Sequence, residues 1–542
     1  MMNIDQDDRN PRLGSSIASF VKNPSVLFGL VLLISTISKL AALNSRELWL
    51  NETYSAFVAN LPFAKILRYA AGDVHPPLFY LLLHSWIQIV GDAQAQLRLF
   101  SVVLNFFSAL AMFVLARRML GARFGAYAAI LFVLSPMLFV FSLEVRMYAL
   151  FILLFACLLM VHWLVAVEQR EDRWLVVAYG VLAALLFYVQ YIGIFIILGV
   201  FIHWLIASAF PRRRFIRLFA AGLLTILLVS PGVPVLLHQY AGKTQLTRAL
   251  TLSRQNPGAL TFGAPAQNPA EPGGIKVMVK NAAAMLGFYP AASTPLLLLC
   301  AIPLVLSLAY AGFLGVIKSD EICRLFCLIT LALGVGMFTL HLASTRYMLA
   351  LIPLLVIAIA RAVQVGAAKP RGRVPVIAVA TLVLCLYAAG FFRQAVKQHG
   401  RPWVNLVGAV QQNYRPGDKV IFDALYAQMS FDYFARHMHF QPEEDGFPLS
   451  VYDWWEKQEF KGLGGPVILN SDLDEYVSRL SASRPKAVWL VLNETYYYDP
   501  HDALLARLSQ LGQVTEIRLP PDPDTPDAQV SPPLRLIRIA IN

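Results

Sequence analysis

Apolar stretches long enough to cross a lipid bilayer recur along residues 1–391, and they restrict what this chain can fold into. A membrane-spanning helix needs about 20 predominantly apolar residues, because every backbone N–H and C=O in the hydrocarbon core must be paired internally. About eleven stretches approach this length. They lie near residues 25–43, 98–116, 125–142, 148–167, 174–189, 191–209, 218–238, 293–316, 323–340, 347–364 and 374–391. Since the chain is 57% hydrophobic and 14% charged, we predict a polytopic α-helical membrane protein.

The segment from Pro76 to Gly91 is apolar but short for a full crossing, and it carries His84 and Gln88. Short cytoplasmic loops collect Lys and Arg. If this segment lies along the membrane interface and the N-terminus is cytoplasmic, the basic loops all fall inside. These loops hold Arg117, Arg118 and Arg123; Arg170 and Arg173; Arg212 to Arg214 and Arg217; Lys318 and Arg324; and Arg361, Lys369, Arg371 and Arg373. If the segment crossed the membrane, every later basic loop would lie outside. We therefore predict an interfacial helix.

This topology places the segments 42–97 and 239–292 and everything after Phe391 on the outer side. In the tail, G-D-K-V-I-F-D, G-P-V-I-L-N, K-A-V-W-L-V-L-N and L-R-L-I-R-I-A-I-N are typical of short buried strands. H-D-A-L-L-A-R-L-S-Q-L-G predicts an amphipathic helix ending at Gly512. We therefore predict a transmembrane domain at 1–391 and a soluble α/β domain at 392–542.

Polar residues gather at the predicted outer edge of the membrane domain. They are Asn51 and Glu52 in L-W-L-N-E-T-Y-S, Asp73 and His75 in G-D-V-H-P-P-L, Glu144, Arg146 and Tyr148 in S-L-E-V-R-M-Y-A-L, and Arg346 and Tyr347 in S-T-R-Y-M. Ionisable groups at membrane depth are costly and usually face a cavity or one another, so their positions indicate a site. A simpler alternative for Glu144 and Arg146 is an ion pair within a hairpin, without a catalytic role.

These residue types suit the transfer of a sugar from a lipid-phosphate carrier. A phosphate leaving group needs fixed cations, which Arg146, Arg346 and His75 could supply at headgroup depth. An acceptor hydroxyl needs a base as the sugar carbon is attacked, and a carboxylate at the same edge can serve. Apolar grooves between the spans would hold the prenyl tail of the carrier. Sugar nucleotides fit poorly, because they are cytosolic and the polar cluster is on the outer edge.

Five motifs resemble the GT-C glycosyltransferases of the protein-O-mannosyltransferase and aminoarabinose-transferase type. They are L-W-L-N-E-T-Y-S, D-V-H-P-P-L-F-Y-L-L-L-H-S-W, R-L-F-S-V-V-L-N, E-V-R-M-Y-A-L and S-T-R-Y-M-L-A-L-I-P, which together span about residues 25–360. H-P-P-L after an acidic loop is fairly specific, whereas R-Y-x-L-x-L-x-P alone is weak. The resemblance implies horizontal helices in the first outer loop, polyprenyl-phosphate sugar donors and inversion at the sugar carbon.

The resemblance also marks a departure at the expected catalytic position. Many relatives carry Asp-Glu where this chain has Asn51 and Glu52, and that Asp is commonly the base. An amide cannot accept the proton, so Glu52 or Asp73 takes the role, the donor geometry differs, or the chain is a weak or inactive relative. We predict Glu52 with Asp73 as catalytic residues. The predicted substrate-binding residues are Asn51, His75, Glu144, Arg146, Tyr148, Arg346 and Tyr347.

The expected partners are a polyprenyl-phosphate sugar, membrane lipids and a lipid, glycan or protein acceptor, at the periplasmic face of a bacterial inner membrane. No cofactor is required, since Arg and His can meet a monophosphate, although relatives with diphosphate donors use a divalent cation beside such carboxylates. The net charge of +12 lies in short clusters between apolar runs, so nucleic acid is not an expected partner. The alternatives are a transporter or flippase of a lipid-linked saccharide, which would favour mid-membrane polar sites and repeated halves, and a non-catalytic relative.

Overall fold

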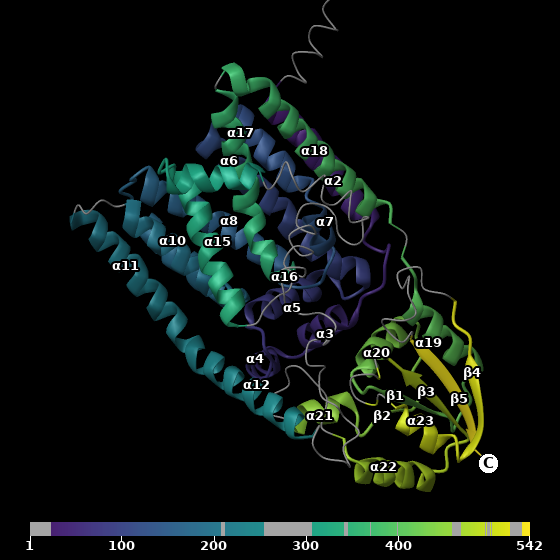
Figure 1. Cartoon of the computed structure of the whole chain (residues 1–542). Helices are drawn as coiled ribbons and strands as arrows, with labels where there is room; N and C mark the ends of the chain where they lie inside the picture. Colours follow the sequence, from purple (N-terminus) through teal and green to yellow (C-terminus); the bar gives the residue numbers. More distant parts are fainter. Residues whose placement is uncertain are drawn as a thin grey trace, which may run out of the picture.

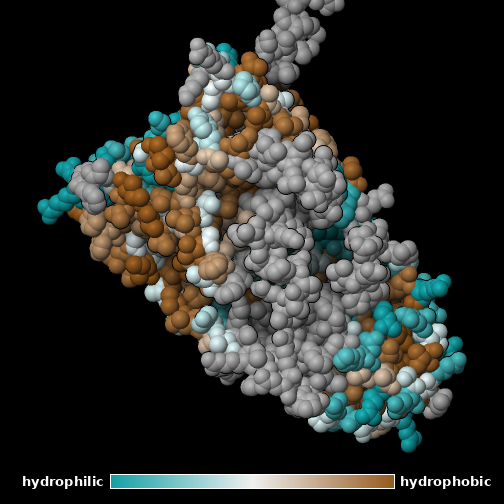
Figure 2. All heavy atoms as spheres, viewed as in Figure 1, coloured by the Kyte–Doolittle hydropathy of each residue, from teal (hydrophilic) through white to brown (hydrophobic). Residues whose placement is uncertain are grey.

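Apolar helices form most of the computed structural model, and a small β-sheet lies at one end of them (Figure 1). The structure describes residues 23–541 except 208–211, 254–305, 341–344, 369, 398, 458–467, 494, 496–498, 500 and 521–533. The second outer loop, predicted at 239–292, and the first part of the span predicted at 293–316 therefore lie mostly outside the described residues. In Figure 2 brown, apolar side chains cover the helices, and teal, polar side chains gather over the sheet.

Within the described ranges, seven helices are long and apolar enough to cross a membrane, and further apolar helices are shorter. This arrangement is that of a multi-pass membrane protein. The helices of this bundle are α2 (Pro24–Ala41), α6 (Gln94–Val133), α7 (Pro136–Ser142), α8 (Tyr148–His162), α9 (Arg173–Val189), α10 (Gly193–Ala207), α11 (Arg212–Val229), α12 (Val233–Ser253), α15 (Glu321–Thr339), α16 (Thr345–Met348), α17 (Ile352–Ala367) and α18 (Arg373–Ala395).

Helix α6 contains two predicted spans, because it is folded back on itself. Its 40 residues would extend about 60 Å if straight, twice the thickness of the hydrocarbon core. Gly121 breaks it with φ 78°, a left-handed conformation that favours glycine. A Cβ on Gly125 would meet the backbone of Arg117 at 2.5 Å, so the two arms pack closely after the break. The second arm ends at Val133, earlier than the predicted residue 142.

The first outer loop contains three short helices, α3 (Leu50–Asn60), α4 (Phe63–Ala71) and α5 (Leu78–Val90). Helix α5 coincides with the segment predicted to lie along the interface. Its 13 residues extend about 20 Å, too short to cross, and Gly91 ends it with φ 99°. The loop is therefore folded against the end of the bundle, as horizontal helices would be.

The C-terminal unit is a five-stranded mixed sheet in the order β2-β1-β3-β5-β4. Its strands are β1 (Lys419–Asp423), β2 (Glu444–Gly446), β3 (Ala487–Leu492), β4 (Gly512–Ile517) and β5 (Arg535–Ile541). Strands β1 and β2, and β1 and β3, pair in parallel, while β5 pairs antiparallel with β3 and β4. The helices are α19 (Pro402–Asn413), α20 (Ala427–His437), α21 (Val451–Lys457), α22 (Asn470–Ala482) and α23 (Ala503–Leu508).

Three of the four predicted strands are β1, β3 and β5. The fourth, at 465–470, does not form a regular strand where it is described, because Leu469 makes only an isolated β-bridge and Asn470 begins α22; residues 465–467 lie outside the described set. The helix predicted to reach Gly512 ends at Leu508, and Gly512 instead begins β4. Helix α18 continues past Phe391 to Ala395, and the domain boundary at 391 stays a prediction.

The C-terminal unit is fastened directly to the first outer loop. The Glu47 carboxylate accepts hydrogen bonds from the backbone N–H groups of Trp403 and Val404, both at 2.8 Å, and so caps α19. The hydroxyls of Thr53 and Ser430 lie 3.0 Å apart in a buried contact between α3 and α20. The loop is thus held between the bundle and the sheet.

Glu47→Gln should loosen the C-terminal unit. An amide cannot accept both N–H groups, and a helix N-terminus left unsatisfied costs about 1–3 kcal/mol. We expect a lower melting temperature and faster limited proteolysis near α19. Glu475→Gln, at an exposed position of α22, is the matched control and should behave like wild type. Equal proteolysis rates for the two variants would contradict the cap.

Candidate active site

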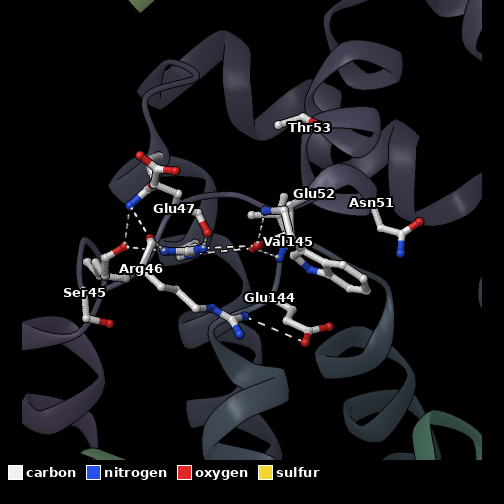
Figure 3. A network of polar contacts seen from close by, with 12 residues as sticks. Ser45, Arg46, Glu47, Asn51, Glu52, Thr53, Glu144 and Val145 are labelled. Atoms are coloured by element: carbon white, nitrogen blue, oxygen red, sulfur yellow. Dashed lines mark hydrogen bonds and ion pairs between the residues drawn. The ribbon is translucent and has the colours of Figure 1, made fainter. Parts of the chain in front are cut away.

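The centre of the site is a fully buried ion pair between Glu52 on α3 and Arg98 on α6 (Figure 3). Arg98 Nε and Nη2 donate to the two Glu52 oxygens at 3.3 and 3.0 Å. The remaining guanidinium N–H groups donate to the backbone oxygens of Leu43, Arg46 and Glu47. All five Arg98 donors are therefore used, and the beginning of the first loop is wrapped around this side chain.

Glu52 has no lone pair left for a substrate. Besides Arg98, its oxygens accept the backbone N–H of Val145 at 3.0 Å and of Trp49 at 3.2 Å. A carboxylate offers about four acceptor sites, and all are occupied. Burial alone would raise the pKa of Glu52, but the Arg98 guanidinium outweighs it and holds the pKa below its usual range. The geometry thus makes Glu52 a positioning group, which speaks against its predicted role as a catalytic base.

Asp73 lies in a different environment, in the loop between α4 and α5. Its carboxyl is 6% exposed, and the Tyr80 hydroxyl donates to it at 3.4 Å, a long contact. The Tyr54 hydroxyl and the Val74 N–H also donate toward it. Burial raises the pKa of Asp73, and these donors and the Arg146 charge offset only part of that shift. A carboxylate with a raised pKa and no close ion pair is a stronger base than an ordinary Asp.

Arg146 supplies a buried cation beside Asp73. Its Nη1 donates to the Asn51 backbone oxygen at 3.3 Å and to the Ser55 hydroxyl at 3.2 Å. Its charge interacts with Asp73, Tyr54 and Tyr80. The buried Nε has no hydrogen-bond partner among the described residues. Such a donor is costly unless an acceptor is supplied.

The residues around Arg346 bring a distant part of the chain to the same place. Arg346, on α16, is exposed and lies over the Trp49 ring at 5.2 Å. Its charge interacts with His75, Glu144 and Tyr148. Tyr347 follows it and is close enough to interact with Tyr148. The last predicted motif therefore does meet the first loop.

His75 does not supply the cation that its sequence position indicated. Burial lowers its pKa well below the usual range, and the Arg146 and Arg346 charges lower it further. His75 is therefore neutral at pH 7, because a buried imidazole between two guanidinium groups resists protonation. It can still donate or accept one hydrogen bond.

Glu144 and Asn51 occupy the edges of this network. One Glu144 oxygen lies 3.7 Å from Arg46, and the other is buried without a partner among the described residues. Burial raises the pKa of Glu144 to about 7. Glu144 pairs with Arg46 from the first loop, so a local ion pair with Arg146 is not what the structure shows. In Figure 3 the Asn51 side chain points away from Glu52 and Glu144.

Sequence reasoning placed the predicted residues near one another but missed Arg98, Arg46, Tyr54 and Tyr80. Arg98 was present in the motif R-L-F-S-V-V-L-N, and a single arginine at the start of an apolar span was the available signal. For Tyr54 and Tyr80 there was no signal in the sequence beyond their position next to the acidic motifs. Among the described residues, no group of three or more His, Cys, Asp or Glu is placed to hold a metal ion.

Comparison with known proteins identifies the type of enzyme. The family model for dolichyl-phosphate-mannose-protein mannosyltransferase matches residues 74–238. The structure resembles ArnT from Cupriavidus metallidurans in the apo state, with 15% identity, a TM-score of 0.57 and coverage of 96% of this chain and 98% of that one. The chain has the fold of ArnT, and its match to a mannosyltransferase family model indicates glycosyltransferase activity.

Two further structures share the GT-C fold. ArnT from Cupriavidus metallidurans bound to undecaprenyl phosphate has 13% identity and a TM-score of 0.53, with coverage of 94% of this chain and 97% of that one. The Archaeoglobus fulgidus oligosaccharyltransferase, tethered with an acceptor peptide, has 12% identity and a TM-score of 0.51, with coverage of 95% and 76%. No curated protein matches the sequence of this glycosyltransferase significantly.

Arg98→Met should destabilise this protein by about 3–5 kcal/mol, because it leaves a buried carboxylate unpaired. The double variant Arg98→Met with Glu52→Gln should recover part of the loss, since no buried charge then remains. Thermal unfolding in detergent measures both. If the double variant is less stable than Arg98→Met, the ion pair does not organise the loop.

Glu144 should make stability depend on pH. Its folded pKa of about 7 lies above the value near 4.3 expected for an unfolded Glu. Protonated Glu144 therefore favours the folded state below pH 4, and this contribution is lost as the pH rises through 7. At pH 8, Glu144→Gln should be more stable than wild type by roughly 2–4 kcal/mol. The difference in stability between the two proteins should vanish near pH 4. A difference that stays constant at all pH values would contradict the raised pKa of Glu144.

Proposed function

We propose that this chain transfers a sugar from a polyprenyl-phosphate carrier to an acceptor at the periplasmic face of a bacterial inner membrane. The observation that carries the proposal is the meeting of Asp73, Arg146 and Arg346 at one end of a GT-C fold. The Asp73 carboxylate can accept a proton, and the two arginines can face a phosphate. The ArnT structure with undecaprenyl phosphate supports a carrier of this class.

Asp73 is the proposed base. It is buried and has a raised pKa, although Tyr54, Tyr80 and the Val74 N–H donate toward it. Glu52, whose four acceptor sites are filled, keeps the loop in place instead. The residue Asn51 cannot accept a proton, so the base role moves from the first acidic motif to the second.

Arg146 and Arg346 are the proposed contacts of the leaving phosphate. The unpaired Arg146 Nε needs an acceptor, and a phosphate oxygen satisfies a guanidinium N–H well. Arg346 reaches the same region from α16, held over Trp49. As the bond between the sugar carbon and phosphate oxygen breaks, these cations stabilise the developing charge. In this proposal no cofactor or metal ion is required.

Neutral His75 and Tyr148 are proposed to orient the donor through hydrogen bonds, with Tyr347, Asn51 and Glu144 at the margins of its site. The acceptor is a lipid, a glycan or a protein. Because the fold resembles both ArnT and an oligosaccharyltransferase, it does not favour one of these three acceptor classes over the others. The fold gives no support to a transporter or flippase.

The decisive experiment compares Asp73→Asn with Glu52→Gln in transfer of labelled sugar from polyprenyl phosphate to membrane acceptors. Asp73→Asn should lower kcat by about 10²- to 10⁴-fold, as expected for loss of a general base, with little change in melting temperature. Glu52→Gln should instead lower the melting temperature. Normal turnover by Asp73→Asn, in protein that is folded, would refute the assignment of the base.

A further inference from the structure

A basic pocket lies at the beginning of α11, at the end of the bundle away from the first loop and the sheet (Figure 1). It is lined by Val165, Gln169, Glu171, Trp204, Arg214 and Arg217, and its volume is about 60 Å³. Val165 and Trp204 are buried and form an apolar floor, whereas the arginines are half-buried. Such a cavity has room for a group of the size of a phosphate.

Positive charge around this pocket exceeds the negative charge that the described residues provide. Arg217 pairs with Glu171 at 3.4 Å, and Arg214 donates to the neutral amide oxygen of Gln169. Within the described part of the chain, no carboxylate lies within ion-pair distance of Arg212, Arg213 or Arg214. Close arginines repel one another unless an anion lies between them, and guanidinium groups match phosphate oxygens in geometry.

An apolar stripe begins immediately beside these arginines. Ile216, Phe219, Leu223 and Ile226 are all exposed on α11, and their spacing of three and four residues puts them on one face of the helix. Arg212 lies four residues before Ile216 and so heads the same stripe, whereas the half-buried Arg214 and Arg217 lie on the other side of α11, toward the pocket. In Figure 2 a teal rim at the left of the molecule borders a brown surface. This combination of polar head and apolar side is complementary to a phospholipid rather than to a soluble anion.

We propose that this pocket binds the phosphate headgroup of an anionic phospholipid in the membrane leaflet opposite to the active site. The phosphate lies between Arg214 and Arg217, at the end of a helix whose outer face is exposed to lipid. The excess of basic residues in cytoplasmic loops is general, but a lined pocket beside an exposed apolar stripe is specific to this position. Basic pockets between membrane helices are suited to lipid headgroups.

The test measures how much dioleoylphosphatidylglycerol the purified full-length protein retains in detergent, by native mass spectrometry. Arg214→Gln with Arg217→Gln should retain roughly 10- to 30-fold less lipid, since each surface arginine contributes about 1 kcal/mol to such binding. Glu171→Gln should bind about two- to fivefold more, because it frees Arg217 from its competing carboxylate. A gain in binding cannot result from misfolding.

Arg123→Gln is the matched control. It removes one exposed arginine near the Gly121 break of α6 and lies outside the pocket lining, so retention should stay at the wild-type level. Equal loss in Arg123→Gln, unchanged binding in both pocket variants, or equal retention of phosphatidylcholine would overturn the proposal. Thermal stabilisation by inorganic phosphate equal to that by the lipid would assign the pocket to a free anion and would also overturn it.

Discussion

The buried Glu52–Arg98 pair is the constraint on which the active end of this glycosyltransferase depends. Two opposite charges without solvent contact are stable together only when every remaining donor and acceptor is also satisfied. Here five donors and four acceptor sites are all used. Because those partners come from the first loop, the start of α6 and the α7–α8 turn, one pair fixes three segments at once. The positions of Asn51 and Arg146, which neighbour Glu52 and Val145 in the sequence, follow from it.

This constraint explains how adjacent residues of one motif come to have different tasks. Glu52 faces inward to Arg98, and Asn51, the next residue on α3, points elsewhere (Figure 3). On a helix, neighbouring side chains are about 100° apart, so they cannot share one partner. Asn at position 51, where the resemblance leads us to expect Asp, therefore leaves the Glu52–Arg98 pair intact. A second carboxylate, Asp73, interacts with Arg146 and is the proposed base.

Much of the fold follows from the sequence because membrane helices satisfy their own backbone and need only length and apolarity. Helix α5 is short, as the interfacial prediction from loop charge requires. The sequence could not show that the residue predicted as a base, Glu52, is saturated, because its partner Arg98 is 46 residues away and both look like ordinary polar residues at a membrane edge. The neutral state of His75 also depends on two arginines from distant motifs. Short strands such as β2 were missed because three residues carry no periodicity.

The attachment of the C-terminal unit has a mechanical consequence for the site. Glu47 caps α19 through its side chain, while its backbone oxygen accepts from Arg98. The same residue is therefore bonded to the soluble unit and to the anchor of the catalytic loop. Tyr69 on α4, about one helical turn before Asp73, also donates to Glu456 of α21 at 3.0 Å. The segment that carries Glu52 is therefore bonded to the soluble unit at both ends, through Glu47 and Tyr69, and Asp73 follows directly after it.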